Sequence, residues 1–488
     1  MLPLASSFAS VGGTNLSGQT FVVIGLGKSG IGAAKLLLRR GARVIALDEN
    51  AAAASPIDDP RFELKAGAFP AEFWKGATAV VVSPGVPLSK PELVAAKAAG
   101  AVIYGEIELA YRTMPKGAGP ILGITGTNGK STTTALLGEL VKQHVPRTFV
   151  GGNLGTAFTL AYESPDEKPY DQHVIELSSF QLEGVQDARF KVAAILNLTA
   201  DHIDRYPSQE AYGLAKARIF DGQQPGDFAV VNADDPEVLM LSRRAKVPVY
   251  AFTLDARKTN PGFAGLAVGS GEKFAFTFGV PAVFTVTNRA LRGAHNLQNA
   301  MAAALMARLA GIPDAAIQRG LDSFPGLPHR LEFVRERGGV EWINDSKATN
   351  VDSSLVAMKA LRGDVWLIAG GKGKGAPYAP LVESARGKVK GVLTIGKDAP
   401  AIAAAFAGLC PILDCGTIEK AVAQAAEIST RGDTVLLSPA CASYDQFNNF
   451  EHRGDVFKAL VQSLPLPEGD GELAPRGQQR VGERARRD

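Results

Sequence analysis

The chain has 488 residues and a mass of 51.2 kDa, with 46% hydrophobic and 21% charged residues. A chain of this length and composition can build about two to four packed domains. The net charge of +3 comes partly from an arginine-rich C-terminal stretch, RGQQRVGERARRD, so it gives little support for nucleic-acid binding. The sequence has no long apolar run and no basic leader, and its three cysteines lack metal spacing. We therefore expect a globular cytoplasmic protein that neither binds nucleic acid nor enters a membrane.

The first predicted unit is a βαβ motif in residues 20–50, TFVVIGLGKSGIGAAKLLLRRGARVIALDEN. A buried strand, an amphipathic helix and a second strand follow one another. Gly25, Gly27 and Gly30 match the dinucleotide-binding pattern G-x-G-x-x-G, and Asp48 follows where a ribose-binding acid is expected. Further strands at ATAVVVSPG and AVIYG complete a small Rossmann-like domain. The alternative is that the glycines only allow close packing of the helix.

Residues 120–134, PILGITGTNGKSTTT, closely resemble a phosphate-binding P-loop but lack its first glycine. A short apolar strand, a Gly-rich loop and a helix-compatible segment follow in the order that a phosphate site requires. Gly126 and Gly129 allow close approach of the backbone, Lys130 supplies a cation, and Ser131 or Thr132 supplies a hydroxyl for Mg²⁺. An ordinary strand-to-helix turn is the alternative, and it does not explain GKSTTT.

Polar residues follow the next predicted strands of this second α/β region. Glu176 ends the strand in YDQHVIELSS, His202 lies in the loop of LNLTADHIDRYPS, and Lys216 lies on the helix EAYGLAKARIF. Ligands gather at the C-terminal ends of strands in parallel sheets, so these groups should converge above the P-loop. Glu176 and His202 could then hold a metal ion. The alternatives are a helix-capping acid, a loop histidine and a surface lysine.

A third region begins near residue 328 and repeats the pattern of strands that end in polar or Gly-rich loops. The strand VEWIND leads to Asp345 and Lys347, DVWLIAGGKGKG leads to Lys374, and TVLLSPACASYDQF leads to Ser443. These features predict another doubly wound sheet with a site along its C-terminal edge. A solvent-exposed turn is the alternative for GKGKG.

Eight motifs together resemble the Mur ligases of bacterial peptidoglycan synthesis: GITGTNGKSTT, ELSSFQLE, NLTADHIDRY, AKARIF, HNLQN, PHRLE, NDSKATN and SPACASYDQFNNFEHRG. The resemblance covers nearly the whole chain except about the first dozen residues and the arginine-rich tail. It also explains the variant P-loop, because this family uses T-G-T-N-G-K-[ST]. The last two motifs point to the members that join D-glutamate to UDP-N-acetylmuramoyl-L-alanine.

The resemblance implies an α/β fold with three domains. They are a Rossmann-like UDP-substrate domain in residues 1–115, a P-loop ATP-binding domain in 116–330 and a Rossmann-like amino-acid-binding domain in 331–467, followed by a disordered tail in 468–488. It also implies a cytoplasmic, monomeric ligase that forms an acyl phosphate. The expected small molecules are ATP, Mg²⁺ (two ions), UDP-N-acetylmuramoyl-L-alanine and D-glutamate.

The resemblance further assigns site residues. Those expected to contact ATP are Gly126, Thr127, Asn128, Gly129, Lys130, Ser131, Thr132, Asn296, Asn299, Arg330 and Asp345, with His295 in the same segment. Those expected to contact the UDP-substrate are Gly27, Lys28, Ser29, Asp48, Ser83, Gly85, Asn153 and Ser178. Those expected to hold D-glutamate are Thr349, Lys374, Ser443 and Phe450.

The same comparison implies the catalytic and metal-binding groups. The catalytic residues are Lys130, Glu176, His202, Lys216 and Lys347, and the metal site comprises Ser131, Glu176, His202 and Lys216. Lys216 is expected to be carbamylated, which converts a cation into an anion that can help to position metal. Carbamylation requires the neutral amine.

Three other functions remain compatible with parts of the sequence. An NAD-dependent dehydrogenase would use the glycines and Asp48 of the first region but would leave the P-loop unused. A nucleotide switch would use the P-loop alone. A related ligase, including the folylpolyglutamate type, would add a different amino acid, although folate ligases lack the N-terminal Rossmann-like domain.

Overall fold

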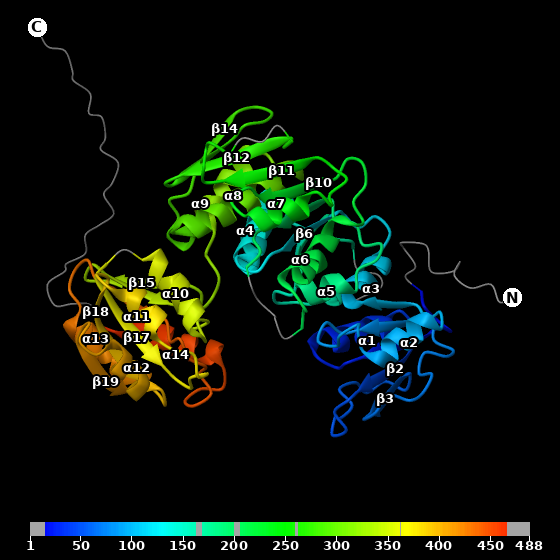
Figure 1. Ribbon diagram of the computed structural model, residues 1–488, viewed down its shortest axis with the longest axis horizontal. Helices are drawn as coiled ribbons and strands as arrows, with labels where there is room; N and C mark the ends of the chain where they lie inside the picture. Colours follow the sequence, from blue (N-terminus) through cyan, green and yellow to red (C-terminus); the bar gives the residue numbers. More distant parts are fainter. Residues whose placement is uncertain (1–14, 163–167, 200–204, 259–261, 362, 466–488) are drawn as a thin grey trace, which may run out of the picture. The chain divides into compact units, whose positions relative to one another are not determined.

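The computed structural model describes residues 15–162, 168–199, 205–258, 262–361 and 363–465. Three β-sheets follow one another along the chain, each combined with helices (Figure 1). The predicted α/β fold with three successive sheets is therefore confirmed. The chain divides into two compact units, residues 1–325 with the first two sheets and residues 326–488 with the third. In the described ranges, no helix has the length and apolar character needed to span a membrane.

The first sheet has five parallel strands in the order β3-β2-β1-β4-β5. Its elements are β1 (Thr20–Ile24), α1 (Lys28–Arg39), β2 (Arg43–Asp48), β3 (Phe62–Ala66), β4 (Ala79–Val82), α2 (Pro91–Ala98) and β5 (Ile103–Gly105). The Gly-rich loop lies between β1 and α1, as predicted. Helix α1 ends just before Gly41, whose φ of +91° favours glycine because a Cβ is disfavoured in that region.

The second sheet has nine strands in the order β14-β13-β12-β11-β10-β9-β6-β8-β7. All are parallel except the antiparallel pairs formed by β13 with β12 and β14. Its strands are β6 (Ile121–Thr125), β7 (Thr148–Gly152), β8 (Gln172–Glu176), β9 (Val192–Ile195), β10 (Phe228–Asn232), β11 (Val249–Thr253), β12 (Gly265–Ser270), β13 (Lys273–Phe276) and β14 (Ala282–Thr285). The helical elements are α3 (Glu106–Arg112), α4 (Lys130–Lys142), η1 (Phe158–Leu160), α5 (Ser179–Glu183), α6 (Gln209–Ala217), η2 (Arg218–Phe220), α7 (Pro236–Ser242), η3 (Arg289–Leu291), α8 (Ala294–Leu309) and α9 (Asp314–Ser323).

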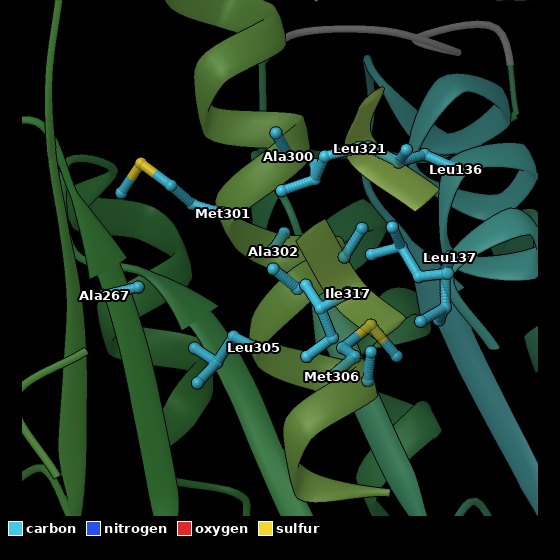
Figure 2. Close-up of a cluster of buried hydrophobic side chains, with 14 of the residues drawn as sticks. Leu136, Leu137, Ala267, Ala300, Met301, Ala302, Leu305, Met306, Ile317 and Leu321 are labelled. Carbon is cyan, nitrogen blue, oxygen red and sulfur yellow. The ribbon is translucent and has the colours of Figure 1, made fainter. Parts of the chain in front are cut away.

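Helix α8 is central to the core on one face of this sheet. Its sequence, AHNLQNAMAAALMARL, is apolar almost all round, and every residue from Leu297 to Ala307 except Gln298 is buried. Figure 2 shows Met306 of α8, Ile317 of α9 and Leu137 of α4 within one cluster of buried apolar side chains, to which Leu305 of α8 also belongs. Because small alanines allow close approach of neighbouring elements, α8 can pack tightly on α4 and α9. This packing brings the N-terminus of α8 near the N-terminus of α4.

The first two sheets are joined by a close backbone contact. Gly105, at the end of β5, donates from its amide to Gly184 O at 2.8 Å, and a Cβ on Gly184 would lie 2.6 Å from Gly105 Cα. Glu108 of α3 is fully buried and accepts hydrogen bonds from the amides of residues 186–188 just after α5. These contacts fix α5 against the C-terminal edge of the first sheet.

His173 on β8 predicts acid sensitivity of the second sheet. Burial lowers the pKa of this imidazole to about 4, and its ring nitrogens lie 2.6 Å from Tyr162 Oη and 3.0 Å from Gly119 O. In the unfolded chain the His173 imidazole binds a proton near pH 6.5, whereas in the folded chain it binds one only near pH 4. The free energy of unfolding should therefore fall by about 3 kcal/mol as pH decreases through this interval.

A His173→Gln variant tests this prediction, because glutamine does not titrate. Urea unfolding between pH 4.5 and pH 7 should show a weaker pH dependence in the variant than in the parent protein, whatever their absolute stabilities. Equal slopes for the two proteins would contradict the assignment of the acid sensitivity to His173.

The third sheet, in the second unit, has six strands in the order β15-β16-β20-β17-β18-β19, parallel except for the β15-β16 pair. Its strands are β15 (Glu332–Arg337), β16 (Val340–Asn344), β17 (Val365–Gly370), β18 (Val389–Ile395), β19 (Ile412–Gly416) and β20 (Thr434–Leu437). Its helices are α10 (Val351–Ala360), α11 (Ala379–Ala385), α12 (Ala399–Phe406), α13 (Ile418–Ile428) and α14 (Phe450–Ser463). The tail predicted in residues 468–488 lies outside the described residues, and the predicted domain boundaries stay predictions.

Candidate active site

The P-loop connects β6 to α4, as the sequence predicts. Gly126 and Gly129 have φ values of +154° and +80°, which turn the backbone sharply before α4 begins at Lys130. Lys130 Nζ folds back over the loop and donates to Gly126 O at 2.9 Å and to Thr127 O at 2.8 Å. The amides of the first turn of α4 form the positive end of the helix dipole, so this loop suits an anionic phosphate group.

An asparagine that sequence reasoning did not single out stabilises the P-loop. Asn197, just after β9, accepts from Asn128 N at 2.7 Å through its side-chain oxygen and donates to Asn128 O at 3.0 Å. Its backbone carbonyl also accepts from Thr127 N at 3.0 Å. Two signals could have identified it: Asn197 is a polar residue just after a buried strand, and it is the first residue of the motif NLTADHIDRY.

Asn299 of α8 lies against the same loop. Its Oδ1 accepts from Thr133 Oγ1 at 3.2 Å, and its Nδ2 donates to Asn296 Oδ1 at 3.1 Å. Both asparagines are almost fully buried, at 6% and 7% exposure. The structure therefore brings the two predicted adenine-binding asparagines to the P-loop, and His295 lies half-buried in the same turn of α8. Their contacts with a nucleotide stay predictions.

Gly129 gives a testable prediction for this loop. A Cβ at residue 129 would lie 2.4 Å from Asn299 Oδ1, in addition to the strain of a positive φ. We expect Gly129→Ala to weaken ATP binding at least about tenfold, because the loop or the buried Asn299 side chain must move out of its present place. Equilibrium binding of ATP measured by calorimetry tests this expectation.

Gly117→Ala is the matched control for that variant. Gly117 has a similar φ of +85°, but a Cβ there would meet no atom within 4 Å. This control should lose stability through backbone strain and keep its ATP affinity. If both variants bind ATP as the parent does, the close contact of Gly129 with Asn299 does not matter for nucleotide binding.

Glu176 ends β8 beside the P-loop strand, where Ile124 of β6 is its register partner. The carboxylate is 1% exposed, and its Oε1 accepts from Asn153 Nδ2 at 2.7 Å. Its Oε2 is buried and accepts no hydrogen bond from the described residues. A buried carboxylate oxygen without a donor is destabilising unless a cation or solvent satisfies it, so this oxygen fits a Mg²⁺ ligand.

Lys216 is in the last turn of α6 and is only 1% exposed, so the surface-lysine alternative is wrong. Its Nζ donates to Gly126 O at 2.8 Å and lies 4.4 Å from the ring centroid of Tyr212. Gly126 O thus accepts from both Lys130 and Lys216. The predicted convergence of the α6 lysine on the P-loop is present in the structure, whereas carbamylation stays a prediction.

His202 lies outside the described residues, so its predicted place in a metal site stays a prediction. Among the residues that are described, no cluster of three His, Cys, Asp or Glu side chains could hold a metal ion by itself. A site built from Glu176, a P-loop hydroxyl and substrate phosphates would not form such a cluster. Ser131 and Thr132 lie in the first turn of α4, where that hydroxyl is needed.

The Gly-rich loop of the first sheet is held by its neighbours. Asp48 Oδ2 accepts from Leu26 N at 2.8 Å, and Ser83 Oγ donates to Gly25 O at 2.6 Å. Lys28 begins α1, and a Cβ on Gly30 would lie 1.9 Å from Gly25 O. The structure therefore brings together Gly27, Lys28, Ser29, Asp48, Ser83 and Gly85. It also shows that Asp48 and Ser83 each stabilise the loop itself.

Asn153 and Ser178, the other two residues expected to contact the UDP-substrate, lie beside Glu176. Asn153 follows β7 and holds the Glu176 carboxylate. Ser178 caps α5 by accepting from Gln181 N at 3.2 Å, and the Gln181 side chain in turn accepts from Ser178 N at 3.0 Å. This reciprocal capping fixes the start of α5 next to the predicted metal ligand.

In the second unit, Asp345 follows β16 and is 4% exposed. Burial raises the pKa of its carboxyl to about 7, although Ser438 Oγ and Leu331 N donate to it at 2.8 and 3.2 Å. Arg330 also lies near enough to favour the charged form. The predicted residues Arg330, Asp345 and Lys347 therefore lie close together, because Lys347 N donates to His329 O at 3.0 Å.

A buried arginine that sequence reasoning missed joins two predicted loops of this unit. Arg453 of α14 is 1% exposed and donates to Ser346 O at 2.8 Å and to Cys441 O at 3.1 Å. It therefore connects the turn that carries Asp345 and Lys347 to the loop that carries Ser443. Its only sequence signal was its place within the last motif.

The four residues expected to hold D-glutamate differ in their surroundings. Ser443 is buried at 2% exposure, and Phe450 begins α14, where its carbonyl accepts from Ser346 Oγ at 2.8 Å. Thr349 follows the Lys347 turn, with its amide donating to Lys347 O at 2.9 Å. Lys374 is exposed in the loop after β17, which pairs with the Ser443 loop through Lys372 and Ala442.

The first unit thus has the features of a P-loop nucleotide-binding protein, with a buried carboxylate, two lysines and three asparagines around the loop. Family models give the more specific assignment. The Mur ligase MurD-like N-terminal domain matches residues 19–105, the Mur ligase middle domain matches 124–307, and the Mur ligase glutamate ligase domain matches 329–441. The chain belongs to the Mur ligase family.

Curated relatives agree with the family models over almost the full length. A UDP-N-acetylmuramoylalanine–D-glutamate ligase of Myxococcus xanthus (strain DK1622) is 59% identical over 458 residues, covering 92% of this chain and 99% of the relative. The protein of the same name from Anaeromyxobacter dehalogenans (strain 2CP-C) is 49% identical, covering 91% of this chain and 98% of the relative.

Solved structures of the family share the fold at lower sequence identity. MurF ligase from Thermotoga maritima in complex with ADP has a TM-score of 0.56 and 18% identity, covering 93% of this chain and 97% of the other. UDP-N-acetylmuramate-alanine ligase MurC from the same organism has a TM-score of 0.55 and 18% identity, covering 91% of this chain and 99% of the other. The family models and the curated relatives thus confirm the family resemblance inferred from the motifs, and the solved structures show the shared fold.

Proposed function

We propose that this chain is an ATP-dependent ligase that joins D-glutamate to UDP-N-acetylmuramoyl-L-alanine, a step in peptidoglycan precursor synthesis. The observation that carries the proposal is the identity of 59% over 92% of the chain with a relative of that name. The P-loop with Lys130, Lys216 and Glu176 around it supports the ATP-dependent part of the proposal.

The proposed reaction has two chemical steps. A carboxylate oxygen of the alanine attacks the γ-phosphorus of ATP, and ADP leaves, so an acyl phosphate forms. The amine of D-glutamate then attacks the acyl carbon, and phosphate leaves with the oxygen that made the first bond. Two anions must meet in the first step, so cationic groups between them lower the barrier.

We assign the first step to groups at the P-loop. Lys130 would contact the β- and γ-phosphates, and the amides of the first turn of α4 would stabilise negative charge there. Glu176 Oε2, Ser131 and His202 would hold Mg²⁺, which supplies positive charge next to the phosphates. Two ions are expected if a carbamate on Lys216 provides a further anionic ligand.

The place of Lys216 supports its modification. The side chain is buried with its amine beside the P-loop, and the neutral amine is the form that reacts with carbon dioxide. The carbamate would carry a negative charge near Gly126 O, where the unmodified lysine donates a hydrogen bond. Asn296 and Asn299 would contact the adenine, and residues Gly126, Thr127, Asn128, Gly129 and Thr132 would surround the phosphates.

We assign substrate binding to the two remaining sheets. The Gly-rich loop with Lys28, Ser29 and Ser83 would hold the UDP moiety, and Asn153 and Ser178 would lie further along the substrate. In the second unit, Thr349, Lys374, Ser443 and Phe450 would hold D-glutamate. Arg330, Asp345 and Lys347 would act on the nucleotide and the transferred phosphate. We expect a cytoplasmic monomer.

Oxygen isotope transfer tests the proposed chemistry. UDP-N-acetylmuramoyl-L-alanine labelled with ¹⁸O in its terminal carboxylate is incubated with the enzyme, Mg²⁺, ATP and D-glutamate. One labelled oxygen should appear in each phosphate released, because the acyl oxygen leaves with the phosphorus. Unlabelled phosphate, formed together with product, would contradict the acyl phosphate.

A further inference from the structure

Arg205 links the second sheet to a loop of the first one. Its Nη1 donates to Pro84 O at 2.9 Å, in the loop after β4, and its Nη2 donates to Glu183 Oε2 at 2.8 Å, on α5. The guanidinium carbon lies 4.1 Å from the ring centroid of Phe180. The Arg205 side chain is 13% exposed and its partner Glu183 is 19% exposed. One planar cation therefore connects α5 to the loop.

The end of this link on α5 is firmly held. Glu183 accepts from Arg205 through Oε2 and from Tyr206 Oη through Oε1 at 2.5 Å. The Tyr206 ring also stacks on Phe180, with 5.9 Å between centroids and 24° between planes. A partly buried carboxylate with two donors and an aromatic stack has little freedom to move. The guanidinium is therefore oriented before it reaches Pro84.

The loop after β4 packs on the first sheet, because Val86 and Leu88 contact the buried core of that sheet. A cavity of about 10 Å³, room for about one water molecule, separates residues 83–88 from α5. Pro84 and Val86 line it from the loop, and Phe180 and Gln181 line it from the helix. Because side chains do not fill this space, apolar contacts do not hold the loop against α5 at this point. The hydrogen bond from Arg205 to Pro84 O supplies a directional restraint that packing does not.

The restrained carbonyl lies between two residues assigned to the UDP-substrate. Ser83 and Gly85 flank Pro84, and Ser83 Oγ holds Gly25 O of the Gly-rich loop at 2.6 Å. A shift of Pro84 therefore moves Ser83, and with it the position of the Gly-rich loop. Arg205 itself need not touch the substrate to affect its binding.

We propose that Arg205 is a positioning residue for the UDP-substrate, holding residues 83–85 in the conformation that binds it. The inference rests on the proposed function, because it takes the Gly-rich loop as the UDP site. Lysine cannot replace arginine fully here, since one ammonium group does not present two donors in the fixed fork that reaches both Pro84 O and Glu183.

Calorimetric titration with UDP-N-acetylmuramoyl-L-alanine and steady-state kinetics on the full-length protein test the proposal. Arg205→Ala should raise both the Kd and the KM for this substrate at least about tenfold. The KM for ATP and the kcat at saturating UDP-substrate should stay within about threefold of the parent values. Arg205→Lys should give an intermediate Kd.

Arg218→Ala is the matched control. Arg218 also binds α5 and its C-terminal turn, with Nε donating to Leu182 O at 2.9 Å and Nη2 to Val185 O, and among the described residues it makes no hydrogen bond with the loop after β4. If loosening α5 alone mattered, this control would raise the Kd as much as Arg205→Ala does. That result, or an unchanged Kd in Arg205→Ala, would overturn the inference. If the parent protein does not bind the UDP-substrate, the proposed function fails instead.

Discussion

Lys130→Ala should reduce ATP-dependent turnover at least about a thousandfold while leaving the protein folded. Lys130 Nζ is the side-chain cation that folds over the P-loop, where it donates to the carbonyls of Gly126 and Thr127. Alanine keeps the helix, since it has the best helix propensity, but removes the charge that phosphates need. Rate measurements at saturating ATP and unfolding curves check the two halves of the prediction.

Lys142→Ala serves as the control for helix α4. Lys142 is the last residue of the same helix and is exposed, so it shares the helical environment and lacks contact with the P-loop. It should keep parental turnover. An active Lys130→Ala variant would contradict the role of the P-loop. If Lys130→Ala does not fold, the turnover of Lys130→Met is measured instead, and we expect the same loss of at least about a thousandfold.

Lys216→Ala should lose at least about a hundredfold in turnover and regain part of it with millimolar acetate or propionate. The buried lysine points at Gly126 O, so truncation leaves space next to the P-loop that a short carboxylate can enter. A carboxylate would replace the carbamate's charge, whereas it could not replace an ammonium group. Turnover measured across a series of carboxylate concentrations tests this prediction.

Two further observations separate the carbamate from an unmodified lysine. Protein incubated with ¹³C-labelled bicarbonate should show a carbamate carbon signal that is missing in Lys216→Ala. Neutral acetamide of similar size should not rescue that variant. Parental activity in Lys216→Ala, or equal rescue by acetamide and acetate, would contradict the proposed modification.

Strand and loop prediction succeeded where apolar runs were buried. The segments TFVVI and RVIALD coincide with β1 and β2, because both are apolar runs with buried positions, the first followed by a glycine and the second ending in an acid. Strand β3 was not predicted, because FELKA is a half-exposed edge strand with charged residues at two of five positions. Edge strands carry too few apolar residues for periodicity to identify them.

Only part of the candidate site could be predicted from local sequence. The P-loop can be recognised within 15 residues because its chemistry is contiguous. Asn299, however, reaches Thr133 from 166 residues away, and only the family resemblance indicated it. Lys216 would be taken for a surface residue from its own segment, since burial depends on packing against elements far along the chain.

Two arginines show which contacts local sequence could not predict. Arg453 joins two loops and Arg205 joins a loop to helix α5, and nothing in their own segments shows which carbonyl they reach. Charged residues are usually solvated, so sequence reasoning assigns them to the surface unless a fold brings partners to them. Their contribution became visible only through distances in the folded chain.

The most direct test of the central claim is phosphate release by the purified protein with Mg²⁺, ATP and UDP-N-acetylmuramoyl-L-alanine, measured against a panel of D- and L-amino acids. We predict release with D-glutamate and only background release with L-glutamate, D-aspartate and other members of the panel. Release that depends on a different amino acid would contradict the proposed substrate, and no release with any of them would contradict the proposed ligase activity.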